Sequence, residues 1–322
     1  MRALITGGNG FVGRHLAACL RERGDDVLVA GRPHDGGDVD LPFELRDGQS
    51  VDQVIETARP DAVFHLAAQA FVPEGNRDPL ATYETNVMGT ARLFEALRRH
   101  ASNGDAPRVL YVSSAEIYGR RPAGEQPLRE EQSPKPATPY AASKVAGEAI
   151  VLASYATFGI PGIVARAFNH IGPGQSERFA VAGFAAGLAA IALGARPPRL
   201  DVGNIEARRD FLDVRDVVRA YVALVERAAP GEVYNVCSGT PVAIKEVLRQ
   251  LIAIANVPVE VREDPARLRP SDTPLSCGDN GKLRRTTGWE PQFALGRSLR
   301  DAFADALARR EASLAGGERR SR

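Results

Sequence analysis

A glycine-rich turn directly behind the first apolar residues constrains the fold of this chain more than any other feature. The opening residues 1–13 read MRALITGGNGFVG, in which the apolar run 3–5 is followed by three glycines, Gly7, Gly10 and Gly13. The pattern over 14–23 predicts a helix. Glycines at these positions let backbone N–H groups and a helix N-terminus approach a pyrophosphate without an intervening side chain. The order strand, glycine turn and helix therefore predicts a dinucleotide site.

Alternating strand and helix patterns extend this prediction to a fold class. Apolar, β-rich runs at 26–30, 61–67 and 108–113, with a shorter candidate strand at 42–47, alternate with helical periodicity that is clearest over 86–100. This order is typical of a doubly wound parallel sheet with right-handed crossovers, whose ligands bind at the carboxyl ends of the strands. The predicted fold class is α/β, a Rossmann-type sheet with a smaller mixed α/β C-terminal domain.

The second half of the chain has a more mixed pattern. It predicts, in chain order, a strand at 163–167, a glycine- and proline-rich loop at 168–176, a helix at 179–193, a strand at 232–236, a helix at 244–255, an irregular stretch at 262–279 and a helix at 297–310. We expect a cofactor domain made of residues 1–167 with 208–240 and a substrate domain made of residues 168–207 with 241–312. Residues 313–322 are expected to form a disordered tail.

Composition and charge argue against several classes of partner. The 41 Lys and Arg residues are balanced by 40 Asp and Glu residues, which indicates neither nucleic acid nor an anionic membrane as a partner. No long uncharged apolar run indicates a membrane span, and the N-terminus leads directly into a strand, so we expect a cytoplasmic protein. The three cysteines lack CxxC spacing and are expected to be core thiols rather than metal ligands, namely Cys19, Cys237 and Cys277.

Three side chains form the predicted reaction site. Thr138 is suited to cap a helix that begins just after it, which places Tyr140 and Lys144 one turn apart on one helix face. A free tyrosine has a pKa near ~10, so it needs a nearby cation and a helix N-terminus to exchange protons at neutral pH. Ser114 follows the strand 108–113 and can hydrogen-bond the oxygen that is reduced or oxidised. The arrangement predicts hydride transfer at a secondary alcohol or ketone with a nicotinamide cofactor.

The end of the second predicted strand indicates which nicotinamide cofactor is used. Arg32 lies where a side chain faces the adenosine ribose, and arginine there pairs with a 2′-phosphate, whereas a carboxylate favours a free 2′-hydroxyl. Arg32 therefore favours NADP(H), with NAD(H) still possible; the alternative is a solvated cation at the strand end. The small residues Ala67 and Ala68 permit close approach of a ligand. His65 lies within the same apolar strand and is expected to be a core histidine.

Five motifs together give the chain a family resemblance. They are TGGNGFVG (6–13), HLAAQ (65–69), NVMGT (86–90), SSAEIYG (113–119) and PYAASK (139–144). In this order they resemble the extended short-chain dehydrogenase/reductase superfamily. The second half resembles its members that act on GDP-deoxyhexoses, through RAFNHIGPGQS (166–176), VGNIEARRDFLDVRDVVRAY (202–221), VYNVCSG (233–239) and LRPSDTP (268–274). The resemblance implies reduction of the C4 ketone of a GDP-linked 4-keto-6-deoxyhexose by NAD(P)H.

The resemblance also implies roles for individual residues. The catalytic group would be Ser114, Tyr140 and Lys144, with Glu116 at the place where related dehydratases have a catalytic glutamate. The cofactor would contact Gly7, Gly10, Phe11, Val12, Gly13, Arg32, Glu44, Leu66, Ala67, Ala68, Asn86, Tyr140 and Lys144. The nucleotide sugar would contact Ser114, Glu116, Asn169, Arg209, Arg269 and Asp272. The alternative for each of the two arginines is a surface or loop-bracing role.

Two of these positions depart from the residue that is usual in the family. Glu44 replaces a common aspartate and Asp272 a common glutamate, so each keeps its charge but changes its reach. The superfamily also implies a homodimer, in which helices at 86–100 and 144–158 pair with their copies. The second helix has apolar residues that fit this contact or an intrachain core equally well, namely Val145, Ile150, Leu152 and Tyr155.

Two other activities are compatible with the same motifs. A GDP-mannose 4,6-dehydratase needs a base such as Glu116, but the loop 169–176 resembles the reductases, which makes reduction the favoured activity. Ala115 lacks the carboxylic acid that dehydratases of the dTDP-glucose type have there. A non-catalytic NADP-binding sensor would need the glycine turn but would have no use for Tyr140 and Lys144.

Overall fold

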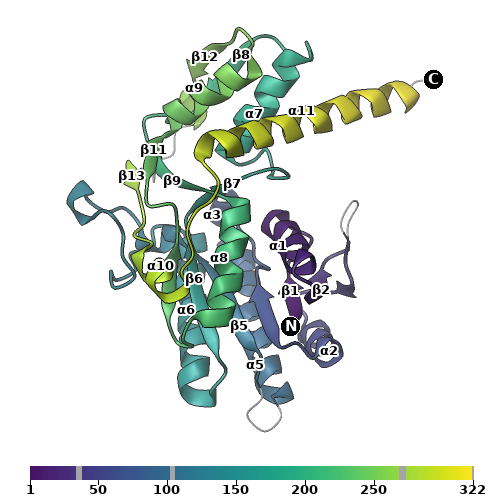
Figure 1. Ribbon diagram of the computed structural model, residues 1–322, viewed down its shortest axis with the longest axis vertical. Coiled ribbons are helices and arrows are strands. Elements are labelled where there is room, and N and C mark those ends of the chain that lie inside the picture. The colour runs from purple at the N-terminus through teal and green to yellow at the C-terminus, as the bar shows by residue number, and fades with distance from the viewer. Residues whose placement is uncertain (34–37, 102–105, 268–272, 321–322) are drawn as a thin grey trace.

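The computed structural model describes residues 1–33, 38–101, 106–267 and 273–320. A seven-stranded parallel sheet forms the lower part of the molecule in Figure 1, with its strands in the order β10, β6, β5, β4, β1, β2, β3. The strands are β1 (Arg2–Thr6), β2 (Asp26–Gly31), β3 (Leu41–Pro42), β4 (Ala62–His65), β5 (Arg108–Ser114), β6 (Gly162–Ala167) and β10 (Val233–Val236). The predicted Rossmann-type sheet is confirmed, and the carboxyl ends of its strands meet at one edge.

Helices cover both faces of this sheet because successive side chains of a strand point to opposite sides. Ala3 and Ile5 of β1 belong to the core on one face, whereas Leu4 belongs to the core on the other. The first face is covered by α1 (Phe11–Glu22), α8 (Val214–Arg227) and α10 (Gly281–Thr287), and the second by α2 (Gly48–Ala58), α5 (Gly89–His100) and α6 (Pro139–Phe158). Three short helices precede α5, namely α3 (Val72–Arg77), α4 (Pro79–Tyr83) and the π-helical η1 (Glu84–Met88).

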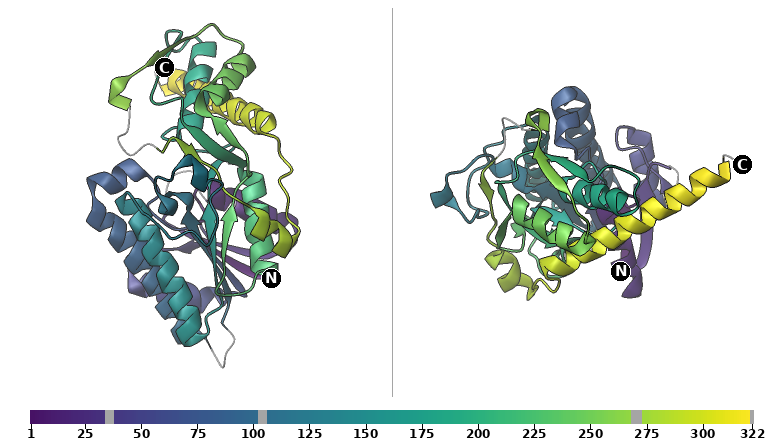
Figure 2. Two further views of the ribbon diagram at one scale, coloured as in Figure 1. Left: turned by 90° about the vertical axis from the view of Figure 1, so that its left-hand side faces the viewer. Right: turned by 90° about the horizontal axis from the view of Figure 1, so that it is seen from above.

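A smaller body lies above the carboxyl edge of the sheet (Figures 1 and 2). It contains a four-stranded sheet of β7 (Asn169–Ile171), β9 (Arg208–Asp213), β11 (Pro241–Ala243) and β13 (Leu275–Ser276), and a pair of strands, β8 (Arg199–Val202) and β12 (Glu260–Glu263). Its own apolar core joins α7 (Ala180–Ala192), α9 (Ile244–Ala255) and α11 (Leu295–Arg320). The remaining elements are short 3₁₀ helices, η2 (Ala115–Tyr118), η3 (Ala123–Glu125) and η4 (Pro265–Arg267).

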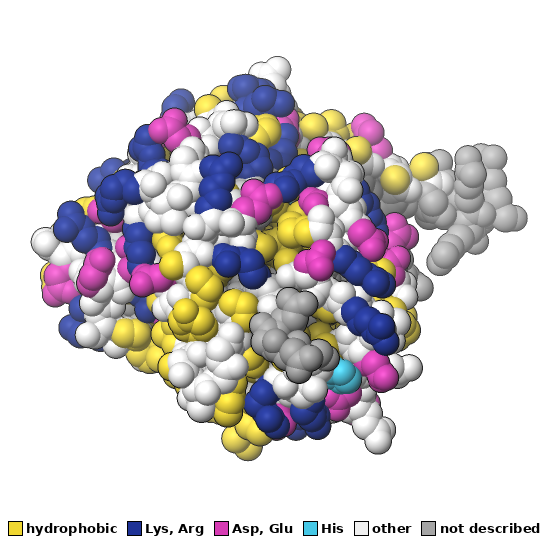
Figure 3. Space-filling model, turned by 60° about the horizontal axis from the view of Figure 1, so that its bottom comes forward, with side chains coloured by type: hydrophobic (Ala, Val, Ile, Leu, Met, Phe, Trp, Pro, Cys, Tyr) yellow, Lys and Arg dark blue, Asp and Glu magenta, His cyan; other side chains and the backbone are white. Residues whose placement is uncertain are grey.

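The surface and the cysteines complete this description. Basic and acidic side chains are interspersed over the face shown in Figure 3. Within the described part of the chain, no helix combines the length and the apolar character that crossing a bilayer requires.

The three cysteines are free thiols; Cys237 and Cys277 are buried and Cys19 is partly buried. His65 is a core histidine as predicted, since it is 2% exposed and lies 2.7 Å from the Thr6 hydroxyl through Nδ1.

Several expected element bounds differ from those in the structure. The strand expected at 42–47 is limited to Leu41–Pro42, because the Asp47 carboxylate accepts a hydrogen bond from the backbone N–H of Gln49 and starts α2. The loop expected at 168–176 contains the strand β7, which pairs with β9. The stretch at 262–279 contains the end of β12 and all of β13.

The last helix is longer than its expected bounds, 297–310. α11 continues to Arg320 and so covers most of the segment 313–322, for which a disordered tail was expected. Residues 306–312 read ALARREA and are all good helix formers, so the sequence has no stop signal at 310, and the first glycines after it are Gly316 and Gly317.

A buried ion pair fastens α6 to the sheet. Glu148 of α6 and Arg166 of β6 are 4% and 5% exposed, and Arg166 Nη2 lies 2.8 Å from Glu148 Oε2. Arg166 Nε donates to the other carboxylate oxygen at 3.0 Å, which makes the contact bidentate. The Ser113 hydroxyl also donates to Glu148, and Arg166 Nη1 donates to the Tyr118 hydroxyl at 3.0 Å. Each charge therefore has the partners that a buried charge needs.

Replacing Glu148 by glutamine is expected to destabilise the fold, because Arg166 keeps its buried charge and loses its counter-charge. We expect urea unfolding to show a loss of about 3 kcal/mol in the free energy of unfolding. Glu95→Gln is the matched control, since Glu95 makes the same bidentate contact with Arg98 at the exposed surface of α5. Water screens that pair, so its loss should leave the unfolding midpoint unchanged. Equal shifts for the two variants would contradict the role given to the buried pair.

Candidate active site

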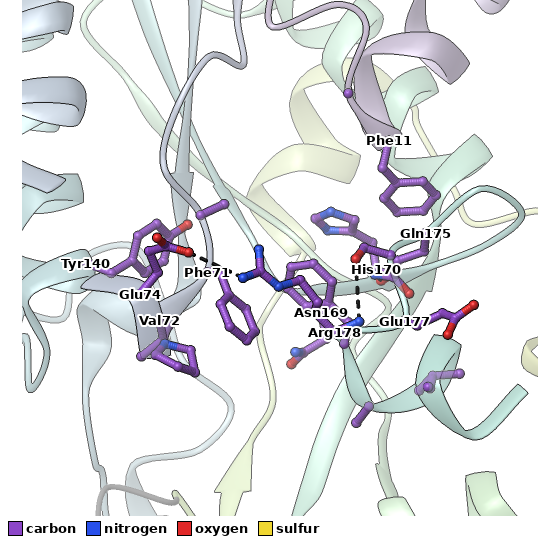
Figure 4. Close-up of a pocket in the computed structure, with 18 of the residues that line it drawn as sticks. Phe11, Phe71, Val72, Glu74, Tyr140, Asn169, His170, Gln175, Glu177 and Arg178 are labelled. Carbon is purple, nitrogen blue, oxygen red and sulfur yellow. Dashed lines mark hydrogen bonds and ion pairs between the residues drawn. The ribbon is translucent and has the colours of Figure 1, made fainter. Parts of the chain in front are cut away.

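A cavity of about 1970 Å³ lies at the carboxyl edge of the parallel sheet and extends into the smaller body. Its lining includes the glycine turn, the ends of β4 and β5, the start of α6, and residues of β7, α7 and β9 (Figure 4). The predicted site residues that line it are Gly7, Gly10, Phe11, Val12, Gly13, Arg32, Glu44, Leu66, Ala67, Ala68, Ser114, Glu116, Tyr140, Lys144, Asn169 and Arg209. One cavity thus brings together the residues predicted to bind the cofactor and the substrate.

The glycine turn has the geometry that a pyrophosphate site needs. Gly7 has φ +70°, and a Cβ there would lie 2.8 Å from the backbone nitrogen of Ala67. A Cβ on Gly13 would lie 2.5 Å from the Cα of Gly8, so the turn and α1 pack too closely for any side chain at this position. Gly10 is the N-cap of α1 and offers no side chain to its first N–H groups. The turn therefore leaves a cradle of backbone donors beside the cavity, which fits a dinucleotide.

The far end of the cradle carries the residue predicted to recognise a 2′-phosphate. Arg32 follows β2 and has an exposed side chain, while Asn9 Nδ2 donates to its backbone oxygen at 2.8 Å. A Cβ on Gly31 would lie 2.4 Å from Asn9 Oδ1, so a side chain before the arginine would displace the Asn9 amide. Glu44 lies at the same end and accepts from the backbone N–H of Arg46 at 3.1 Å. These contacts fix the backbone at this end of the cradle. The guanidinium of Arg32 stays exposed at the edge of the cavity.

Asn86 differs from the other predicted cofactor residues because it lies beneath the cavity wall rather than on it. It is 1% exposed, accepts from the backbone N–H of Gln69 at 2.8 Å, and donates to the backbone oxygen of Gln69 at 3.0 Å. It also donates to the Ser143 hydroxyl at 2.9 Å. Asn86 thus fixes the loop after β4 to α6, which places Ala67 and Ala68 relative to Tyr140.

The three predicted reacting groups lie together at the end of β5. Thr138 caps α6, its Oγ1 accepting from the backbone N–H of Ala141 at 3.1 Å, which places Tyr140 in the first turn. Ser114 ends β5, and its hydroxyl is near enough to Tyr140 to act against the raised pKa of the phenol. Lys144 lies one turn below, where its Nζ donates to the backbone oxygen of Val112 at 2.7 Å. All three side chains are at least nine-tenths buried.

Burial controls the protonation of these groups. It raises the pKa of Tyr140 to about 12, against the opposing effect of the Ser114 hydrogen bond, and the charge of Glu116 raises this pKa further. Burial lowers the pKa of Lys144 to about 8, while the negative charge of Glu148 opposes this shift. The expected lowering of the Tyr140 pKa is therefore absent. Lys144 Nζ lies 6.0 Å from the centre of the Tyr140 ring and is hydrogen-bonded to the backbone instead. Tyr140 is protonated, the form that donates a proton.

Two of the predicted substrate residues, Asn169 and Arg209, lie on strands of the smaller body. Asn169 begins β7 and has an exposed side chain, and Arg209 lies on β9 with its Nη1 donating to the backbone oxygen of Arg208 at 3.0 Å. Glu116 belongs to η2, directly after β5, so it shares the cavity with Ser114. Arg269 and Asp272 lie outside the described residues.

The structure also brings side chains to the site that the sequence motifs did not indicate. Arg178 Nη2 lies 3.3 Å from Glu74 Oε2, and its guanidinium carbon lies 4.5 Å from the centre of the Phe71 ring (Figure 4). Phe71 meets Phe179 edge to face at 6.0 Å. Glu74 lies on α3, whereas Arg178 and Phe179 come just before the start of α7. These contacts therefore cross the cavity. No local pattern could predict a pair that is 104 residues apart.

Comparisons with known proteins show what the whole chain is similar to. The sequence matches the family described as "GDP-mannose 4,6 dehydratase" over residues 4–302. It is 40% identical to GDP-6-deoxy-D-mannose reductase of Pseudomonas aeruginosa over 304 residues, which are 94% of this chain and 96% of that protein. It is 30% identical to GDP-6-deoxy-D-talose 4-dehydrogenase of Aggregatibacter actinomycetemcomitans over 93% of this chain and 95% of that protein. The solved structure of RMD from Pseudomonas aeruginosa complexed with NADPH has a TM-score of 0.87 and 37% identity, over 96% of this chain and 100% of that chain.

Lys144 gives the protein a pH dependence that can be measured without a ligand. Its side chain loses its proton near pH 8 in the folded protein, whereas its ordinary pKa is 10.5. Between these values the unfolded chain binds more protons, so the contribution of Lys144 to stability rises with pH. The free energy of unfolding of the unmodified protein, minus that of Lys144→Met, should rise by about 3 kcal/mol over this interval in urea unfolding. A difference that stays constant, or falls, would contradict the burial of the ammonium.

Proposed function

Because the chain belongs to the GDP-mannose 4,6 dehydratase family of extended short-chain dehydrogenases/reductases, we propose that it reduces the C4 ketone of GDP-4-dehydro-6-deoxy-D-mannose to GDP-D-rhamnose with NADPH. The observation that carries the proposal is that Ser114, Tyr140 and Lys144 line the same cavity as the glycine turn. Similarity to the reductase of Pseudomonas aeruginosa supports the choice of substrate.

Each protein group then has a defined task. The cofactor supplies the hydride when bound. The backbone donors of the glycine turn would hold its pyrophosphate, and Arg32 would bind its 2′-phosphate. The Ser114 hydroxyl donates a hydrogen bond to the ketone oxygen, which orients and polarises the carbonyl. Tyr140 gives its proton to that oxygen as the C4–H bond forms, so the ketone gains a hydride and a proton and becomes an alcohol. Lys144 lies one turn below Tyr140, where its side chain could bind the nicotinamide ribose. In its protonated form it would place a positive charge beside the reacting groups.

The nucleotide sugar occupies the other side of the cavity in this proposal. Asn169 and Arg209 would bind its nucleotide and diphosphate, the planar guanidinium being suited to paired hydrogen bonds with phosphate oxygens. Arg269 and Asp272 would contribute to the same site. The cofactor would be held by the parallel sheet and its helices, and the sugar nucleotide by the smaller body. β9 with Arg209 belongs to that smaller body, because it pairs with β7, β11 and β13, although the expected bounds placed 208–240 in the cofactor domain.

A dehydratase is the competing activity within the same family. Glu116 lies in the cavity and could serve as the base for a C5 proton, so its position is compatible with elimination. The residues after Asn169 favour the reductase, since His170-Ile171-Gly172-Pro173-Gly174-Gln175-Ser176 resembles the reductases and lacks the sequence typical of GDP-mannose dehydratases at this place.

We also propose a homodimer built on η1, α5 and α6. Three hydrophobic side chains are exposed on η1 and α6, namely Met88 (47% exposed), Tyr155 (38%) and Phe158 (58%). A second copy of the chain would cover them.

Two incubations distinguish the candidate activities. With GDP-4-dehydro-6-deoxy-D-mannose and NADPH, the protein should consume one NADPH for each product formed, measured as loss of reduced-nicotinamide absorbance. With GDP-mannose alone, it should form no product. Conversion of GDP-mannose without net use of cofactor would contradict the proposal in favour of the dehydratase. Binding of NADPH without turnover of any ketosugar would contradict it in favour of the sensor.

A further inference from the structure

One buried polar atom at the cavity has no part in the chemistry described above. Tyr221 lies in the middle of α8 and is fully buried, and its hydroxyl has no hydrogen-bond partner among the described residues. Tyr221 nevertheless lines the cavity, and Val12, Leu66 and Val112, which pack against the same core cluster, also line it. Buried hydroxyl groups are normally paired, so an unpaired one beside a ligand cavity requires an explanation.

The orientation of α8 directs this side chain toward the cavity. α8 begins directly after β9. Its N-terminal end is therefore close to the smaller body, and the helix runs from there along the parallel sheet (Figure 1). Long side chains of a helix lean toward its N-terminus. The Tyr221 side chain therefore leans toward the carboxyl edge of the sheet, where the ligand cavity lies.

The neighbours of Tyr221 indicate which end of a dinucleotide it meets. α8 packs on β5 and β6, the half of the sheet that carries Ser114. Leu66, directly after β4, and Val112, on β5, pack against the same core as Tyr221. Both also line the cavity. Arg32, at the opposite end of the cradle, follows β2 on the far side of β1. Tyr221 thus lies on the side of the reacting groups and not on the side of the adenosine.

We propose that the Tyr221 hydroxyl donates a hydrogen bond to the nicotinamide-riboside end of bound NADPH and holds the redox ring at the reacting groups. Tyr221 is then a positioning residue that acts through the cofactor, and the proposal rests on the proposed function only for the identity of that cofactor. An oxygen of the carboxamide or of the ribose is the acceptor that this end of the molecule offers. Burial raises the pKa of Tyr221, and the charge of an ionised Tyr140 would raise it further, so the hydroxyl keeps the proton that it donates.

The chain supplies a matched control in Tyr111. This tyrosine of β5 is also fully buried, and its hydroxyl also has no partner among the described residues. Tyr111 belongs to the core on the opposite face of the sheet and does not line the cavity. Phenylalanine at either position removes the same atom from an equally buried ring. Only the change at Tyr221 should affect a ligand.

The experiment measures binding by titration calorimetry for the unmodified protein, Tyr221→Phe and Tyr111→Phe. Two probes are used, NADPH and adenosine 2′,5′-bisphosphate, which lacks the nicotinamide riboside. We expect Tyr221→Phe to raise the Kd for NADPH about three- to tenfold, the effect of losing one neutral hydrogen bond. The Kd for adenosine 2′,5′-bisphosphate should not change, and Tyr111→Phe should change neither value. The melting temperatures of the cofactor-free variants should equal or exceed that of the unmodified protein, because each loses an unpaired buried hydroxyl.

The outcomes separate this inference from the proposed function. An NADPH Kd for Tyr221→Phe within about 1.5-fold of the unmodified value, below the effect of a single hydrogen bond, would overturn the inference. Equal losses for the two probes, or equal losses for the two variants, would also overturn it, since they indicate a general structural effect. Failure of the unmodified protein to bind NADPH would instead contradict the proposed function.

Discussion

The active site depends on how one face of helix α6 is fixed to the parallel sheet. Tyr140, Lys144 and Glu148 follow one another at intervals of four residues, so they lie on a single stripe of the helix, and all three are buried. Glu148 is held by Arg166 of β6, and Lys144 by the backbone oxygen of Val112 in β5. With Thr138 capping the first turn, these contacts fix the rotation and height of α6 and bring Tyr140 to Ser114.

The same stripe sets the charge of each group in the site. Burial raises the pKa of Tyr140 and lowers that of Lys144, so the tyrosine carries its proton while the lysine titrates near the physiological range. Below them, Arg166 donates two N–H hydrogen bonds to the Glu148 carboxylate. A protonated phenol beside a serine hydroxyl suits reduction of a ketone, in which the oxygen must receive a proton as the hydride arrives.

Local sequence patterns were sufficient for the parts of the site that are built from one turn or one helix. The glycine turn, the cap at Thr138 and the stripe of Tyr140 and Lys144 are of this kind, and so is the alternation that gives the parallel sheet. Contacts between distant segments left no such pattern, and the bridge from Glu74 to Arg178 shows this most clearly. Asn86 lies in a recognisable motif, but only the fold shows that it holds the backbone of Gln69 beneath the cavity wall. The expected bounds of short elements were wrong where a helix cap or a pairing strand sets them. The Asp47 cap of α2 limits β3, and pairing with β9 makes β7 a strand.

The central claim is that Tyr140 delivers the proton to a carbonyl that Ser114 polarises. The direct measurement is the single-turnover rate of NADPH oxidation by Tyr140→Phe with saturating ketosugar and cofactor, compared with the unmodified protein. Removal of the phenolic proton should lower this rate about 10²- to 10⁴-fold. Because NADPH and ketosugar are both saturating, a change in their affinities does not enter the measured rate. A rate equal to that of the unmodified protein would contradict the account.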